Sequence, residues 1–177
     1  MHNTLRNLGI IAMSLSLSLP IMGKQTDKHP NVLLIVTDDQ GYGDLSLHDN
    51  PYLETPAMDA LAANGVRLDN FYVSPVCAPT RASLLTGRYH PEVGVTSVTR
   101  RREVMDPEET TLAELFQANG YATGCFGKWH NGSFYPETPS GQGFEEFYGF
   151  PYGHIPHYFD PELEHNGEAI HPSGYIT

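Results

Sequence analysis

The feature that most constrains this sequence is a continuous apolar run, Asn31-Val32-Leu33-Leu34-Ile35-Val36-Thr37. Its β-branched residues and its lack of polar alternation predict a strand that is covered on both faces, as in a parallel sheet. Two acidic residues, Asp38 and Asp39, follow it directly. The run therefore predicts an α/β fold with polar residues at the end of a buried strand.

Helices and strands are predicted to alternate along the chain as far as Gly127. In order, we expect a helix between Thr55-Pro56 and Asn64-Gly65, a strand over Val66–Val73, a helix from about Pro79-Thr80 to Thr86-Gly87, a helix over Leu112–Ala118 capped by Thr110-Thr111 and ended by Asn119-Gly120, and a strand over Tyr121–Phe126. The first helix should bury Met58, Leu61 and Ala62. From Gly127 to Thr177 we expect a loop-rich layer. The pattern predicts a mainly parallel sheet sandwiched by helices.

Composition narrows the function classes. Hydrophobic residues make up 40% of the 177 residues, so a wholly disordered chain is excluded. The net charge of -11 disfavours non-specific binding of nucleic acid, which needs many Lys and Arg side chains at phosphates. Two cysteines are too few for a disulfide scaffold or a Cys-rich zinc module.

The first 23 residues are predicted to be a secretory signal. Arg6 precedes a stretch without charge from Asn7 to Gly23, which is rich in Leu, Ile, Ser and Met. An uncleaved anchor and a buried helix are the alternatives. With cleavage after Gly23, loss of Arg6 changes the net charge from -11 to -12, and residues 24–177 form the exported part. We expect a periplasmic or secreted protein with no stable membrane span after cleavage.

Reactive side chains follow three of the predicted strands. Asp38-Asp39 end the first, Cys77-Ala78-Pro79-Thr80-Arg81 follow the second, and Lys128-Trp129-His130 end the third. Because ligands bind beyond the carboxyl ends of strands in an open α/β sheet, we expect these loops to converge on one crevice.

Each group also has a plainer interpretation. Adjacent carboxylates suit a hard cation such as Ca²⁺ or Mg²⁺, but a solvated turn also accommodates them. A helix N-terminus beside Arg81 favours an anion and activates a thiol as a nucleophile. Cys77 would otherwise be a buried structural residue or form a disulfide with Cys125.

The motifs together resemble the type I sulfatases. Cys77-Ala78-Pro79-Thr80-Arg81 with Leu84-Leu85-Thr86-Gly87-Arg88 resembles their signature, in which the cysteine is oxidised to formylglycine by a maturation enzyme. Asn31 to Asp44 resembles the family's opening strand, and Gly127-Lys128-Trp129-His130 its second motif. The resemblance extends from Asn31 to at least Tyr158. It implies an alkaline-phosphatase-like fold and hydrolysis of sulfate esters.

The resemblance also implies roles for single residues. Asp38, Asp39 and the modified Cys77 would bind Ca²⁺, with Mg²⁺ as the alternative ion. Hydrated formylglycine would attack sulfur with one hydroxyl and expel sulfate through the other. Arg81 would hold the hydrate, Lys128 would bind a sulfate oxygen, and His130 would accept a proton. Cys125 is expected to be structural.

The segment Gly149-Phe150-Pro151-Tyr152-Gly153-His154 resembles a substrate-contacting region of the family. Some members have Ser at the position of Gly153, so no side-chain contact is carried over there. His154 would bind sulfate or sugar, or would be an ordinary loop histidine. Four further residues would stack on a sugar or simply pack together, namely Tyr152, His157, Tyr158 and Phe159.

The sequence also lacks motifs that complete sulfatases have. Those proteins are much longer and contribute a further acidic/Asn metal pair, a lysine and a histidine from beyond the position of Thr177. We therefore expect this chain to be the N-terminal part of a sulfatase, poorly folded and inactive alone. A related phosphoesterase or phosphonate hydrolase and a non-catalytic truncated remnant are the alternatives. The substrate would be a sulfated small molecule or glycan, either an aryl sulfate or a sulfated carbohydrate.

Overall fold

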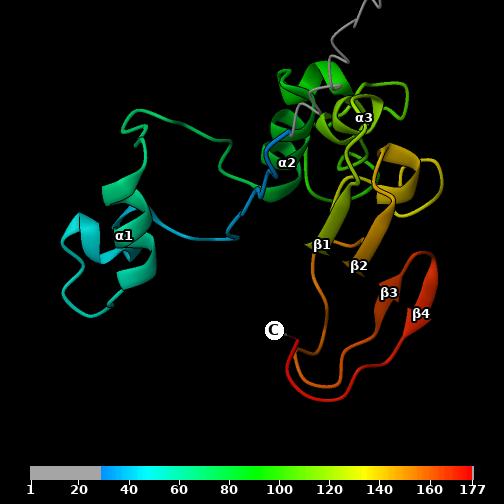
Figure 1. The fold of residues 1–177 in the computed structure, drawn as a ribbon. Coiled ribbons are helices and arrows are strands. Elements are labelled where there is room, and N and C mark those ends of the chain that lie inside the picture. Colours follow the sequence, from blue (N-terminus) through cyan, green and yellow to red (C-terminus); the bar gives the residue numbers. More distant parts are fainter. Residues whose placement is uncertain (1–28, 177) are drawn as a thin grey trace, which may run out of the picture. The chain divides into compact units, whose positions relative to one another are not determined.

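A computed structural model describes residues 29–176, and the predicted signal segment lies outside these residues. The described residues fall into two units with a boundary between Val36 and Thr37. The second unit contains the helices α1 (Pro56–Asn64), α2 (Cys77–Thr86) and α3 (Leu112–Ala118). It also contains the strands β1 (Gly124–Lys128), β2 (Glu146–Phe150), β3 (Leu163–His165) and β4 (Glu168–Ile170) (Figure 1). In the part that the structure describes, no helix is long and apolar enough to cross a membrane.

The four strands form one mixed sheet in the order β1-β2-β3-β4. β1 and β2 are parallel, whereas β2–β3 and β3–β4 are antiparallel. The mixed α/β class is thus confirmed, but the sheet among the described residues is not mainly parallel. The loop-rich layer expected beyond Gly127 is also wrong in part, because three of the four strands lie there.

The close approach of β1 and β2 depends on Gly149, which lies opposite Gly127 in the parallel register. A Cβ atom on Gly149 would lie 1.9 Å from the carbonyl oxygen of Gly127, which is far inside van der Waals contact. No other residue fits at position 149 while the strands keep this spacing.

The core packs α2 against the sheet. Ala78 and Ala82 of α2 are fully buried in a cluster with Phe147 of β2, and the small alanines let the helix approach closely. The remaining fully or nearly fully buried members are Val93, Val95, Met105 and Trp129. This cluster fixes the first turn of α2 relative to the residues that follow β1.

Start and stop residues in the sequence predicted the helix ends correctly, apart from the start of α2. α1 spans the predicted residues, and α2 ends at Gly87, whose φ of 67° is the left-handed value that glycine adopts easily. Thr111 caps α3 by accepting a hydrogen bond from the amide of Glu114, whose side chain accepts from the amide of Thr111. α2 begins at Cys77, two residues before the predicted start, because Pro79 is tolerated in a first turn.

Two predicted strands are wrong among the described residues. Residues 31–37 and 66–73 are not in any sheet, and Leu33, Val66 and Tyr72 are 84%, 90% and 85% exposed. The predicted buried stripe of α1 is wrong as well, since Leu61 is 72% and Met58 36% exposed. A strand requires a neighbour for its backbone groups, and these segments have none in the part described.

These exposed apolar residues should make the chain self-associate. Replacing Leu33 and Ile35 together by Lys should reduce the large species seen in sedimentation velocity and the binding of an apolar fluorescent dye, because it breaks a contiguous apolar patch. A matched control adds a charge at an exposed polar position, Ser173→Lys. Equal association of all three proteins would show that the run is not the cause.

Candidate active site

The residues after β1 continue the parallel pairing beyond the strand end. The amide of Trp129 donates to the carbonyl of Phe150 at 3.0 Å, and the amide of His130 donates to that of Pro151 at 3.1 Å. His130 itself has a φ of 65°, a left-handed value that is uncommon and costly for a residue other than glycine. The pairing therefore holds His130 in a strained backbone conformation, which is frequent at functional sites.

Helix α2 brings Cys77 to this histidine. Cys77 is the first residue of the helix, and its Sγ lies 3.2 Å from Nδ1 of His130. The side-chain amide of Asn131 donates to the carbonyl of Ala78 at 3.1 Å and to that of Glu103 at 3.3 Å. The buried Asn131 thus fastens the start of α2 to the loop that contains His130.

The second ring nitrogen of His130 determines its tautomer. Nε2 lies 3.0 Å from the carbonyl oxygen of Val98, and because a carbonyl only accepts, Nε2 carries the proton. Nδ1 of the neutral ring then has its lone pair toward Cys77. Burial lowers the pKa of His130 below its ordinary value, and the charges of Lys128 and Arg81 act in the same direction, against the hydrogen bond to Val98. The ring is therefore neutral at pH 7 and is a hydrogen-bond acceptor for residue 77.

Gly153, in the bend that follows β2, lies against the ring. A Cβ atom on Gly153 would lie 2.5 Å from Nε2 of His130 and 2.6 Å from Cε1. No contact of this kind follows from a sequence pattern, since the relevant property is the absence of a side chain.

Two cations and one carboxylate lie next to this pair. Nζ of Lys128 lies 2.7 Å from Oδ2 of Asp38, and Nη2 of Arg81 lies 3.9 Å from the same oxygen. Arg81 also donates from Nη1 to the carbonyl of Lys128 at 2.5 Å. The side chains of Arg81 and Lys128 are only 13% and 12% exposed, whereas that of Asp38 is 40% exposed. Two largely buried positive charges sharing one carboxylate leave an excess that favours a further anion.

The structure thus brings together five of the predicted site residues, namely Asp38, Cys77, Arg81, Lys128 and His130. Asp39 is exposed, has a φ of 54° and makes no side-chain hydrogen bond or ion pair with these five residues in the described part of the chain. His154 is exposed and adjacent to Gly153 in the chain, and no hydrogen bond joins its side chain to the cluster among residues 29–176.

The four proposed stacking residues show no common wall. Tyr158 and Phe159 both lie against Tyr175, with ring centroids 6.5 and 5.0 Å apart, which supports ordinary aromatic packing. Tyr152 and His157 are exposed.

A calcium ion would find only part of a binding site in these residues. The adjacent carboxylates of Asp38 and Asp39 are the hard oxygen donors that Ca²⁺ prefers, but the ion takes about six to eight oxygens. Among residues 29–176, no three side chains of the His, Cys, Asp and Glu types are close enough to hold a metal. The two aspartates therefore fit the ion as one side of a coordination shell.

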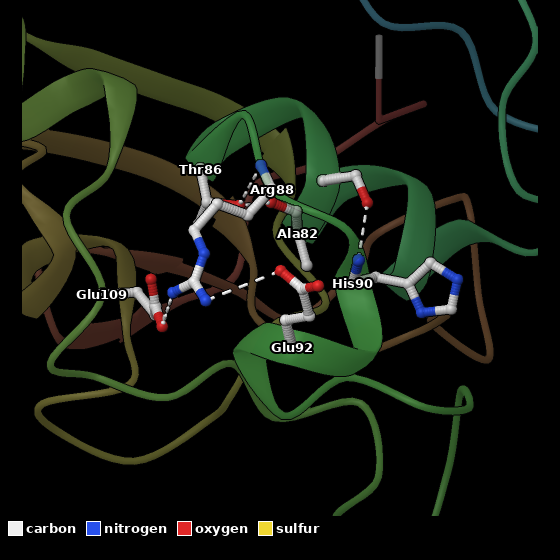
Figure 2. Close-up of polar contacts among 7 residues, drawn as sticks. Ala82, Thr86, Arg88, His90, Glu92 and Glu109 are labelled. Carbon is white, nitrogen blue, oxygen red and sulfur yellow. Dashed lines mark hydrogen bonds and ion pairs between the residues drawn. The ribbon is translucent and has the colours of Figure 1, made fainter.

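Arg88, just after α2, pairs with two carboxylates that flank the segment containing Val98, namely Glu92 and Glu109. Figure 2 shows Arg88 with both of these carboxylates. Arg88 pairs with Glu109 and with Glu92, the latter at 3.6 Å, and its amide donates to the hydroxyl of Thr86 at 3.2 Å. The carboxylate of Glu109 raises the pKa of Arg88 above its ordinary value. The amide of His90 donates to the hydroxyl of Ser83 of α2 at 3.0 Å. Arg88 is part of the predicted signature, but it lies outside the cluster of site residues. Its role in the structure is to hold the loop between Glu92 and Glu109 in place.

Comparisons with known proteins identify the family. The sequence profile of the Sulfatase family matches residues 30–164. Arylsulfatase A of Homo sapiens is 45% identical over 139 residues, which are 75% of this chain and 27% of that protein. Steryl-sulfatase of Mus musculus is 41% identical over 137 residues, 69% of this chain and 22% of that protein.

Solved structures show the same likeness. The crystal structure of Ps i-CgsB has a TM-score of 0.74 and 32% identity, covering 83% of this chain and 38% of that one. A protein in complex with its substrate D-glucosamine-2-N,6-O-disulfate has a TM-score of 0.70 and 30% identity, covering 84% of this chain and 28% of that one. The chain belongs to the sulfatase family, and it spans about a quarter of the length of the two curated relatives.

Cys125 should be chemically inert. Both cysteines are free, so the alternative of a disulfide between them is wrong in this structure. Burial raises the pKa of the Cys125 thiol to about 11, against a smaller opposite effect of Arg81. In a Cys77→Ala chain, alkylation by iodoacetamide should be slow at neutral pH and rise about tenfold per pH unit toward pH 11, because only the thiolate reacts. A rate that levels off near pH 9, as for an exposed thiol, would contradict this, and denaturant should restore that ordinary behaviour.

Gly153→Ala should displace the imidazole of His130. The added methyl group overlaps the ring, so the proton should no longer be confined to Nε2 by the Val98 carbonyl. Nitrogen chemical shifts of the ring report this tautomer directly. Gly43→Ala is the matched control, because a Cβ atom there meets nothing within 4 Å. Unchanged ring shifts in the Gly153 variant would refute the contact.

Proposed function

We propose that the protein of which this chain forms part hydrolyses sulfate esters, using residue 77 after its oxidation to formylglycine. The observation that supports this most is the placement of Cys77 Sγ 3.2 Å from an imidazole nitrogen, beside two largely buried cations. A maturation enzyme would carry out the oxidation. When formed, the hydrated aldehyde supplies one hydroxyl as the nucleophile and a second whose deprotonation releases sulfate.

The chain's own residues would bind and orient the ester. Lys128 and Arg81 favour an anion, and the planar guanidinium of Arg81 is fixed by its bond to the Lys128 carbonyl. The lone pair on Nδ1 of His130 would accept a proton from the hydroxyl of residue 77. Gly153 and the Val98 carbonyl would keep that lone pair in place during the reaction. His154 remains a proposed contact for the sulfate or the sugar.

Asp38, Asp39 and the modified residue 77 would hold the divalent cation, Ca²⁺ by preference. When bound, the ion would polarise an oxygen of the sulfate group. Nζ of Lys128 lies 2.7 Å from Oδ2 of Asp38, so the carboxylate of Asp38 would also orient the lysine.

The proposed substrate is a sulfated carbohydrate. Ps i-CgsB has been solved with k-i-k-neocarrahexaose at 30% identity to this chain, and the disulfated glucosamine is the substrate of another neighbour at 30%. An aryl sulfate is the alternative, since curated relatives are named arylsulfatases. The proposal includes export, with the signal segment removed after Gly23.

Expression of the full-length protein with a maturation enzyme tests the proposal. Peptide mass spectrometry across residue 77 should find an aldehyde, and sulfate esters should be hydrolysed in preference to matched phosphate esters. An unmodified thiol with no turnover would indicate the non-catalytic alternative, and a preference for the phosphate ester would indicate a phosphoesterase.

Lys128→Ala in that protein should lower kcat/KM for a sulfate ester by about a hundredfold, because it removes a charge next to the developing anion. Lys128→Arg should recover part of this loss. Arg67→Ala is the control, since this exposed cation pairs with Asp69 and with no other carboxylate among residues 29–176. Equal activity of the Lys128→Ala and control proteins would contradict the role of Lys128.

A further inference from the structure

Seven cationic side chains lie in the described part of the chain, and two of them lack a carboxylate partner. Five are paired, namely Arg67, Arg81, Arg88, Arg101 and Lys128. Arg100 and Arg102 are exposed and take part in no side-chain hydrogen bond or ion pair within residues 29–176. In a chain with a net charge of -11, two neighbouring cations without an acidic partner call for an explanation.

These arginines lie in a closed reverse turn. The amide of Arg102 donates to the carbonyl of Thr99 at 3.3 Å, and the carbonyl of Arg102 accepts from the amides of Thr96 and Ser97 at 2.8 and 3.1 Å. Arg100 and Arg101 have φ values of 61° and 62°, as in a type I′ turn, where Asn and Gly are usual. The sequence thus places two long cationic residues where they strain the backbone, although smaller residues would relieve it.

Two contacts fasten this turn to the proposed active site. On one side, the carbonyl of Val98 accepts a hydrogen bond from Nε2 of His130. Arg100 is two residues further along the chain, so its Cα atom lies within about 7 Å of that of Val98. On the other side, Arg101 pairs with Glu137, whose carbonyl accepts from the indole of Trp129 at 2.9 Å. Trp129 lies between Lys128 and His130 in the chain. Both contacts therefore end on the segment that binds the reacting residue.

We propose that the turn Thr99–Arg102 is a second anion subsite, in which Arg100 and Arg102 bind an anionic group of the substrate other than the sulfate ester that is cleaved. The inference rests on the proposed function and narrows its substrate class to sulfated carbohydrates that carry at least two anionic groups. Guanidinium groups suit this task, because each offers a planar fork of donors to a sulfate or carboxylate. Arg101 is engaged by Glu137 and holds the turn in place.

A binding experiment with the full-length protein, expressed without the maturation enzyme so that the sulfate ester is not cleaved, tests the subsite without requiring turnover. The probes are a disaccharide with one sulfate on each ring and the same disaccharide with a single sulfate, measured by isothermal titration calorimetry. The wild-type chain should bind the disulfated probe about tenfold more tightly, as expected for two exposed charge pairs. In the Arg100→Gln/Arg102→Gln protein the two probes should bind equally.

Three controls make the result specific. Arg100→Lys/Arg102→Lys should keep part of the preference, and Arg67→Gln should keep all of it. Affinity for the monosulfated probe should be the same in every variant, which shows that each is folded. The preference should also shrink with added salt.

Two outcomes would overturn the inference. One is a preference for the disulfated probe that survives the double Gln substitution, and the other is an absence of binding by the wild-type chain. Failure of the proposed function is distinct, because it would appear as an unmodified Cys77 or an uncleaved sulfate ester while the dependence on Arg100 and Arg102 persisted.

Discussion

Two backbone hydrogen bonds beyond the end of β1 determine the geometry of the whole site. By pairing Trp129 with Phe150 and His130 with Pro151, they bring Gly153 under the imidazole and hold the left-handed backbone of His130. This extension is available only because Gly149 lets the two strands approach closely. The placement of the Cys77 sulfur then follows from packing of α2 on Phe147.

The sequence predicted those parts of the fold that depend on neighbouring residues. The cap at Thr111 and the stop at Gly87 are local, and the structure has both. The runs over residues 31–37 and 66–73 have strand composition, but a strand also needs a partner distant in sequence, and composition does not say whether that partner is present. Strands β2 to β4 were missed because they are three to five residues long and lie among Gly, Pro and aromatic residues.

The site was predictable to the extent that its chemistry resides in side chains. The structure brings Asp38, Cys77 and Lys128 together as expected from their places after predicted strands, although only the last of those strands exists among the described residues. The contributions of Val98 and Gly153 could not be predicted, because one is a main-chain carbonyl and the other is an absent side chain. The local charge of the site could not be predicted from composition either. The net charge of the chain is -11, whereas Arg81 and Lys128 give the site a local excess of positive charge.

The contacts of the site join residues far apart in the chain. Cys77 and His130 are separated by 53 positions, and Asp38 and Lys128 by 90. Closing such long loops is slow compared with forming α2, whose backbone bonds are local. During synthesis at about 5–20 residues per second, the thiol of Cys77 therefore exists for roughly 3–10 s before its imidazole neighbour has even been made. In that interval the sulfur has no imidazole neighbour, whereas in the folded chain Cys77 is half-buried and lies beside His130.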